Sequence, residues 1–163
     1  QGEPGKLGAV TKTDWVLSPN HNERRGKIRL IVLHCDASPS EQATLDWCAR
    51  PESKVSYHAL VHRDGWVSRM VPDERRAWHA GKALWNGVTD VNSVSLGLAF
   101  ANRHDGQEKL TAAQLDIAQA VVQYWAQRYD IEAVVGHRDV APARKTDPYR
   151  APNFRVEDYA CFV

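Results

Sequence analysis

Apolar residues along this chain gather in short runs that have the length of β-strands. The runs at 30–33, 94–100 and 133–136 are apolar almost throughout, which is typical of strands buried on both faces of a sheet. Two further runs, 55–62 and 66–71, flank an Asp-Gly dipeptide. Because Asp-Gly between strand-like runs predicts a β-hairpin, this pair would form the antiparallel part of the sheet.

Two segments between these runs carry helix signals instead. Residues 41–49 follow a Ser-Pro-Ser sequence and end before Pro51, which would stop a helix. Thr111 and Gln114 form a capping-box pattern that opens a second helix. Its apolar positions recur at helical spacing on one face, at Leu115, Ala118, Val122, Trp125 and Tyr129. Strands and helices alternate, so we predict an α/β fold with a central mixed β-sheet flanked by helices.

The chain divides into two parts by pattern. Residues 1–26 carry Gly, Pro, Asn and charged residues without periodicity, and we predict an N-terminal arm over the surface. Residues 27–163 show no composition shift or long linker, and we predict a single domain. The chain starts at Gln1 rather than Met, so a removed leader or a trimmed domain leaves its compartment open.

Composition excludes several kinds of partner. Twenty-one basic and 20 acidic residues give a formal charge of +1, so nothing favours nucleic acid or an anionic membrane. The apolar runs are far shorter than the roughly 20 residues of a membrane span. Three cysteines form no CxxC pair, which indicates neither a disulfide framework nor a cysteine-based zinc knuckle.

The strongest chemical signal is a pair of histidines in distant segments. His34 ends the first apolar run, His137 follows the run at 133–136, and Asp147 lies further along the same segment. Two imidazoles and a carboxylate are the ligand set of an open zinc site, which keeps one position for water. Lys145 adds a cation where negative charge would develop. This set predicts a metal-dependent hydrolase.

These residues also have plainer interpretations. A single histidine at a strand end is more often a hydrogen-bonded structural group than a ligand, and the segment 137–148 could be a solvated basic loop. Pro142 and Pro148 would stiffen that loop and let it fold Asp147 back toward a metal. Cys35 follows His34, but neighbours in a strand point to opposite faces, so we expect it to lie away from the metal.

Five motifs occur in a fixed order along residues 28–154. They are Ile31-Val-Leu-His34, Ser56-Tyr-His-Ala-Leu-Val-His-Arg-Asp-Gly65, Ala77-Trp-His-Ala-Gly81, Asn92-Ser-Val-Ser-Leu-Gly97 and Gly136-His-Arg-Asp-Val-Ala-Pro-Ala-Arg-Lys-Thr-Asp-Pro148. Together they resemble the type 2 family of zinc-dependent N-acetylmuramoyl-L-alanine amidases. This family includes phage endolysins of the T7 lysozyme kind, bacterial anhydro-muropeptide amidases and peptidoglycan recognition proteins, and the resemblance implies their fold.

The resemblance implies a role for each matching residue. His34, His137 and Asp147 match the ligands of one zinc ion. Lys145 matches the lysine that stabilises the oxyanion, and Tyr57 matches the tyrosine that assists the metal-bound water. Substrate contacts are implied for His79, Trp78, Arg144 and Asn92. The plainer roles are packing for the two aromatic residues and a solvated charge for the arginine.

One position departs from the family pattern. Members with a glutamate general base carry it in a Gly-Ile-Glu-like strand, where this chain has Gly97-Leu98-Ala99. Ala99 cannot accept a proton, so the chain either relies on Tyr57 and Lys145 or is inactive. The complete ligand set and the retained lysine favour activity.

We therefore predict a zinc-dependent peptidoglycan hydrolase that cleaves the amide between N-acetylmuramic acid and L-alanine. Residues 27–163 would be its catalytic domain, its partners peptidoglycan or muropeptides, and its state a monomer. The first prediction for its setting is a phage endolysin, which passes from the host cytoplasm to the cell wall. One alternative is a bacterial muropeptide-recycling amidase, secreted or periplasmic. The others are a non-catalytic peptidoglycan-binding recognition domain and a zinc hydrolase of the same fold that acts on another amide.

Overall fold

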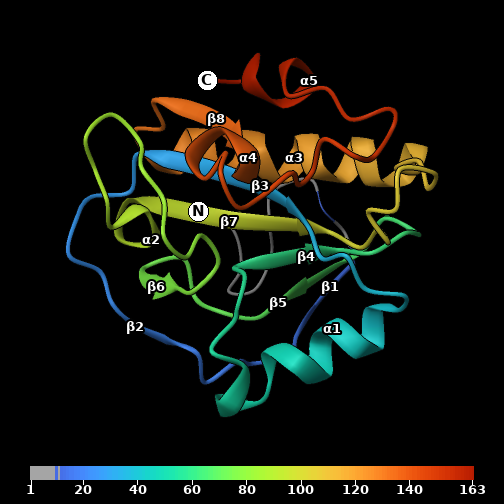
Figure 1. The fold of residues 1–163 in the computed structure, drawn as a ribbon, viewed down its shortest axis with the longest axis horizontal. Coiled ribbons are helices and arrows are strands. Elements are labelled where there is room, and N and C mark those ends of the chain that lie inside the picture. Colours follow the sequence, from blue (N-terminus) through green and yellow to red (C-terminus); the bar gives the residue numbers. More distant parts are fainter. Residues whose placement is uncertain (1–9, 11) are drawn as a thin grey trace.

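A six-stranded mixed sheet lies at the centre of the computed structural model, which describes residue 10 and residues 12–163 (Figure 1). In spatial order its strands are β1 (Thr13–Trp15), β5 (Val67–Arg69), β4 (Ala59–Val61), β7 (Ser95–Phe100), β3 (Leu30–Cys35) and β8 (Ala133–Gly136). A separate two-stranded sheet pairs β2 (His21–Glu23) with β6 (Arg75–Ala77). The predicted α/β fold with a mixed sheet is confirmed.

The inner strands of this sheet position the site. Every residue of β3 and of β7 is buried, as the apolar runs predict. β3 runs parallel to both β7 and β8, so the carboxyl ends of all three meet at one edge, where open sheets place ligands. The only antiparallel pair in the six-stranded sheet of the described residues is β4 with β5, which confirms the hairpin.

Two helices match their predictions and four short ones were not predicted. Ser40 caps α1 (Glu41–Cys48), and Thr111 and Gln114 form both halves of the capping box of α3 (Ala112–Arg128). The short elements are α2 (Val91–Val94), α4 (His137–Val140), α5 (Glu157–Ala160) and the 3₁₀ helix η1 (Pro51–Ser53). Among the helices described, none is both long and apolar enough to cross a bilayer.

The two faces of the sheet have different covers. Ile31, Leu33 and Cys35 belong to the core cluster beneath α3, together with Trp125. The alternate residues of β3, such as Val32, face the opposite layer and pack with residues of α2 and α4. Figure 1 shows α3 lying along β3 and β8, with α1 at the other end of the sheet. As predicted, Cys35 lies on the face opposite to its neighbour His34.

The structure describes part of the predicted N-terminal arm and shows how it is attached. Residues 1–9 and 11 lie outside the described residues, but β1 pairs with β5 at the sheet edge and β2 pairs with β6. Asn20 is buried, and its amide donates to the carbonyls of Arg50 and Val55 at 2.9 and 3.0 Å. Most of residues 12–26 are exposed or half-buried, and the strand pairs and the buried Asn20 tie this segment to the domain. Three-residue strands are too short to show a hydrophobic period.

Candidate metal centre

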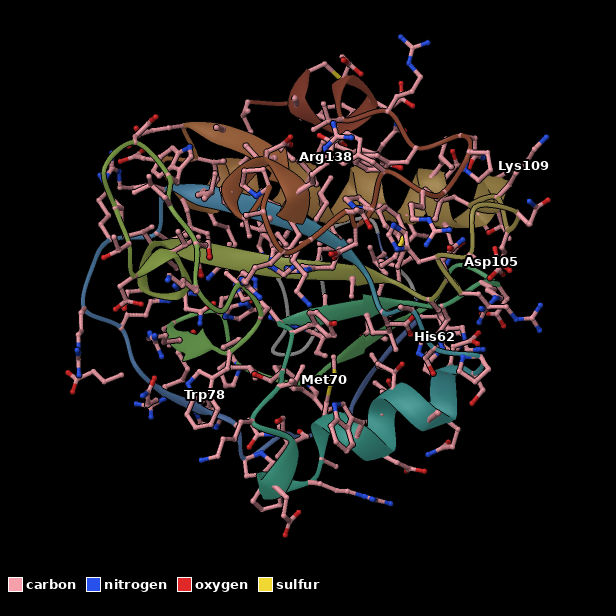
Figure 2. All side chains as sticks on the ribbon, in the orientation of Figure 1. His62, Met70, Trp78, Asp105, Lys109 and Arg138 are labelled. Atoms are coloured by element: carbon pink, nitrogen blue, oxygen red, sulfur yellow. The ribbon has the colours of Figure 1, made fainter. Side chains whose placement is uncertain are left out.

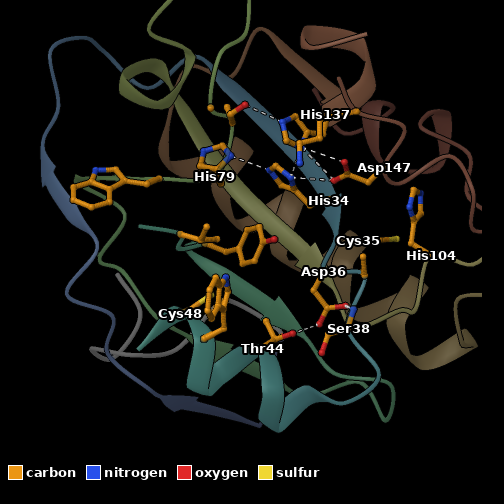
Figure 3. Close-up of a pocket in the computed structure, with 18 of the residues that line it drawn as sticks. His34, Cys35, Asp36, Ser38, Thr44, Cys48, His79, His104, His137 and Asp147 are labelled. Atoms are coloured by element: carbon orange, nitrogen blue, oxygen red, sulfur yellow. Dashed lines mark hydrogen bonds and ion pairs between the residues drawn. The ribbon is translucent and has the colours of Figure 1, made fainter. Parts of the chain in front are cut away.

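His34, His137 and Asp147 meet at the carboxyl edge of the sheet (Figure 3). The Nδ1 atoms of the two imidazoles lie 3.1 Å apart. Asp147 places one carboxylate oxygen 3.2 Å from Nδ1 of His34 and the other 3.2 Å from Nδ1 of His137. All three side chains are buried. The three residues predicted as ligands are therefore brought together.

The spacing of these donor atoms fits a tetrahedral metal ion. Zinc bonds of about 2.0–2.1 Å at tetrahedral angles separate neighbouring ligand atoms by about 3.3 Å, close to the 3.1 and 3.2 Å found here. Two imidazole nitrogens and one carboxylate leave a fourth position open. The donor set therefore suits a zinc ion with an open position.

Strand register aligns the two histidines. Leu33 of β3 pairs with Gly136 of β8 in a parallel ladder. The next residues, His34 and His137, then stand side by side at the strand ends, although 103 positions separate them in the sequence. His137 starts α4, so the segment predicted as a loop from 137 to 148 opens with one helical turn.

Asp147 reaches the histidines because its segment closes tightly on the end of β8. The Arg138 N–H donates to the Asp147 carbonyl at 3.0 Å. A Cβ on Gly136 would lie 2.6 Å from the Tyr149 ring and 2.9 Å from Pro148, so a larger residue would push the segment away. Asp139 also holds the closure, since its carboxylate accepts from the Gly136 N–H and from the Tyr149 hydroxyl.

The far nitrogens of both imidazoles are also engaged. His137 Nε2 donates to the Ala80 carbonyl at 2.9 Å, which leaves its Nδ1 as the lone-pair nitrogen of a neutral ring. His34 Nε2 lies 2.9 Å from His79 Nδ1. Such outer contacts orient metal-binding histidines and fix which nitrogen carries the proton.

The protonation states of the candidate ligands favour a bound cation. Burial lowers the pKa of His34 to about 4, with a further lowering from the neighbouring His137, so its ring is neutral at pH 7. Burial alone would raise the pKa of Asp147, but its close contacts with His137 and His34 outweigh burial and hold it below the usual range. A carboxylate charge and nitrogen lone pairs thus converge on one point.

A cavity of about 990 Å³ opens in front of these residues. It is lined by all three predicted ligands and by six other residues singled out in the sequence, namely Tyr57, Trp78, His79, Asn92, Arg144 and Lys145. The predicted catalytic and substrate-binding residues therefore share one cleft with the candidate ligands.

Lys145 and Tyr57 stand on the cleft wall near the histidines. Lys145 is half-buried and forms no salt bridge within the part of the chain that the structure describes. The Tyr57 ring lies 5.2 Å from the His34 ring between centroids. Burial raises the pKa of Tyr57 well above its ordinary value, so the hydroxyl keeps its proton at neutral pH and remains a hydrogen-bond donor.

Asn92 and Arg144 have structural contacts that the sequence did not indicate. Asn92 Oδ1 accepts from the backbone N–H groups of His79 and Ala80 at 3.2 and 2.9 Å. Arg144 donates to the carbonyls of Ala80 and Lys82 at 3.0 and 2.7 Å. Both side chains therefore anchor residues 79–82. The Ala80 carbonyl in this segment accepts the hydrogen bond from His137.

Among the cleft residues that the sequence did not single out are Asp36, Trp47 and His104. Trp47 is 51% exposed, while its helix neighbours Leu45 and Cys48 are buried. An exposed tryptophan on the polar face of a predicted helix was the available signal. Figure 3 shows Asp36 beyond His34, bonded to Thr44 of α1. Asp36 had no such signal, because its bonds come from α1 and from the end of β7.

Comparisons with known proteins agree on one family. A family model described as N-acetylmuramoyl-L-alanine amidase matches residues 24–150. The 1,6-anhydro-N-acetylmuramyl-L-alanine amidase AmpD of Enterobacter cloacae is 38% identical over 154 residues, covering 82% of this chain and 81% of AmpD.

Two solved structures resemble this one. The crystal structure of a selenomethionine derivative of AmpD has a TM-score of 0.77 and 30% identity, and the match covers 97% of this chain and 98% of that one. The Escherichia coli amidase AmiD, in complex with the substrate anhydro-N-acetylmuramic acid-L-Ala-D-γ-Glu-L-Lys, has a TM-score of 0.66 and 28% identity. That match covers 76% of this chain and 53% of AmiD.

Proposed function

Since this chain belongs to the N-acetylmuramoyl-L-alanine amidase family, we propose that it is a bacterial muropeptide-recycling amidase with one zinc ion. The chain is an enzyme that hydrolyses the amide bond joining N-acetylmuramic acid to the peptide of peptidoglycan. Of the two settings considered from the sequence, the recycling enzyme is favoured over the phage endolysin, because the relative at 38% identity is an anhydro-muropeptide amidase.

One observation carries the zinc proposal. Nδ1 of His34, Nδ1 of His137 and the Asp147 carboxylate converge at 3.1 and 3.2 Å with one tetrahedral position left open. A zinc ion held there would supply a Lewis acid for the amide carbonyl and would lower the pKa of a bound water to about 7.

The chain's own residues supply the other parts of the reaction. Lys145 lines the cleft without an ion-pair partner among the described residues, so its ammonium can stabilise the carbonyl oxygen as negative charge develops there. The C–N bond breaks as the amino group of L-alanine takes a proton. Tyr57 keeps its hydroxyl proton at neutral pH, and we assign it the orientation of the attacking water and the relay of that proton.

Substrate contacts are proposed for the remaining cleft residues. Trp78 is half-buried with its indole N–H bonded to Asn22, so its ring is fixed and can pack against a sugar. Arg144 is exposed and can bind a carboxylate of the stem peptide. His79 and Asn92 lie deeper on the same wall. A cavity of about 990 Å³ is of the size that encloses small molecules, which favours a soluble fragment over intact wall.

A second candidate is a domain that binds muropeptides without cutting them. Ala99 supports it, because this position provides no general base. The complete ligand set and Lys145 favour hydrolysis, since a pure binder needs neither a metal nor a free cation at the carbonyl.

Cleavage assays decide between these candidates. The zinc-loaded protein is incubated with a soluble anhydro-muropeptide and with purified sacculi, with and without chelator, and the products are identified by mass spectrometry. We expect free stem peptide to be released, and faster from the soluble substrate than from sacculi. Chelation should stop this release, and added zinc should restore it. Binding of the muropeptide with no free stem peptide would support the recognition domain. Faster release from sacculi would support a wall-degrading enzyme.

The oligomeric state and the compartment stay predictions. Light scattering on the eluted protein measures whether it is a monomer. Fractionation of the native cells measures whether it is secreted or periplasmic, as predicted for a bacterial enzyme.

A further inference from the structure

A chain of three buried hydrogen bonds runs outward from His34. His34 Nε2 lies 2.9 Å from His79 Nδ1, and His79 Nε2 lies 3.1 Å from the Ser95 hydroxyl. That hydroxyl donates to the Val91 carbonyl at 2.7 Å. The chain therefore links a candidate metal ligand on β3 to the backbone of α2 (Figure 3 shows its first bond).

The last acceptor fixes the direction of every bond in this chain. A carbonyl only accepts, so the single proton of the Ser95 hydroxyl points at Val91, and Ser95 must accept from His79 Nε2–H. A neutral histidine carries one N–H, which leaves Nδ1 of His79 as an acceptor. His34 must then donate from Nε2, and the lone pair of its Nδ1 faces His137 and Asp147.

Packing holds the His79 ring in this place independently of the hydrogen bonds. A Cβ on Gly97 would lie 2.6 Å from Cγ of His79, so the ring rests on β7 at a point where only glycine leaves space. Asn92 anchors the backbone N–H of His79. The imidazole has little freedom to turn and exchange its two nitrogens.

We propose that His79 and Ser95 are positioning residues that keep the proton of His34 on Nε2 and its Nδ1 lone pair on the metal position. The proposal deepens the zinc site and rests on it for its functional meaning. The two histidine ligands are then oriented in different ways, since His137 is held by the Ala80 carbonyl and His34 by a second side chain. A neutral ring protonated on Nδ1 would place an N–H where a metal must bind.

The tautomer can be measured without metal and without substrate. Long-range ¹H–¹⁵N spectra of the imidazoles, recorded on the metal-free protein at pH 7.5, report which nitrogen of His34 carries the proton. We expect the Nε2–H form for both His34 and His79. A neutral His34 ring protonated on Nδ1 would overturn the proposal.

Variants then test whether the chain supports the metal. His79→Leu removes the acceptor and should weaken zinc binding about 10- to 100-fold, the range found when outer partners of ligands are lost. His79→Asn keeps an acceptor near the position of Nδ1 and should restore most of that affinity. Ser95→Ala should weaken zinc binding less than His79→Leu. The His79 ring stays in place, but without the Ser95 hydroxyl its proton can lie on either nitrogen.

Zinc affinity is measured by competition with a chromophoric chelator. The melting temperature of each metal-free variant is measured as well, to show that the variant is folded. Ser68→Ala is the matched control, because Ser68 is a buried β5 hydroxyl that also contacts a histidine, His62, at 2.7 Å outside the cleft. It should leave the zinc affinity unchanged. Equal losses in His79→Leu, His79→Asn and Ser68→Ala would overturn the proposal.

The two proposals fail in different measurements. If the wild-type protein has the Nε2–H tautomer but binds no zinc, the zinc proposal fails and the positioning of the His34 proton stands. If it binds zinc and cleaves muropeptide with His34 protonated on Nδ1 in the metal-free state, the positioning role fails and the amidase proposal stands.

Discussion

His34 and Ala99 occupy paired positions in the parallel strands β3 and β7. Paired residues on neighbouring strands point to the same face of the sheet, so position 99 lies beside a candidate metal ligand. Ala99 is fully buried. By the motif resemblance this is the position of the glutamate in those family members that use one as general base, and here it provides only a methyl group.

Ala99→Glu should therefore raise the rate of muropeptide hydrolysis. A general base contributes about 10²- to 10⁴-fold to a rate, and burial would raise the pKa of the new carboxyl toward neutrality. The measurement is kcat on a soluble muropeptide for the zinc-loaded protein. Ala99→Gln is the matched control, because it has the same size but accepts no proton. Equal gains in both variants would contradict a general-base effect.

Lys145→Ala should slow hydrolysis and leave the zinc content unchanged, because lysine is not a ligand. Loss of one group that stabilises an oxyanion lowers kcat by about 10²- to 10³-fold. Kinetics and elemental analysis of the same sample check both halves of the prediction. Lys109→Ala is the control, since Lys109 is exposed and does not line the cleft (Figure 2). A wild-type rate in Lys145→Ala would rule out the proposed role.

Removal of zinc should lower the melting temperature. A metal that binds only the folded chain stabilises it by about 2.7 kcal/mol at a free concentration one hundred times the Kd. Differential scanning calorimetry with chelator and with added zinc measures this shift. In His34→Ala one of three ligands is missing, and we expect zinc to have little effect on its melting temperature. An unchanged wild-type melting temperature under both conditions would argue against a metal site.

Stability should fall in acid as the ion pair between Glu108 and Arg63 is lost. The Arg63 guanidinium holds the pKa of Glu108 below its ordinary value of 4.5. The stabilisation is thus present above pH 4.5 and disappears as the pH falls through the lower pKa of the folded state.

Glu108→Gln should accordingly lower the free energy of unfolding at pH 7 by about 1 kcal/mol or less, since the pair is partly exposed. The difference from wild type should shrink progressively as the pH falls below 4.5. Urea titrations at pH 7 and at a series of lower pH values measure it. A difference that does not change with pH would show that the substitution acts through packing instead.

The sequence predicted the elements that are long and the residues that are chemically unusual. The buried strands, the hairpin and α3 follow from apolar runs, an Asp-Gly turn and a capping box. His34 and His137 could be predicted to meet, because both follow strand-like runs. Asp147 was expected to fold back on a loop stiffened by Pro142 and Pro148, but the sequence did not indicate the close packing of Tyr149 against Gly136 on which its approach depends.

What the sequence missed depends on pairs of residues far apart in the chain. The strands β1 and β2 have three residues each, too few to show a period. Asn92 and Arg144 were predicted to contact substrate, and their bonds to the backbone of residues 79–82 emerge only when the segments meet. The His79 to Ser95 contact likewise joins a loop to β7.

The pairing of Leu33 with Gly136 also sets the order in which the protein can assemble. The two histidines that follow are separated by 103 positions, so they meet only after a long loop has closed and β3 has paired with β8. The contact that brings Asp147 to them is local by comparison, because its segment packs on Gly136 a short way along the sequence. The three donor groups therefore converge only in a chain in which β3 and β8 have paired, so the metal site depends on the long-range step of folding.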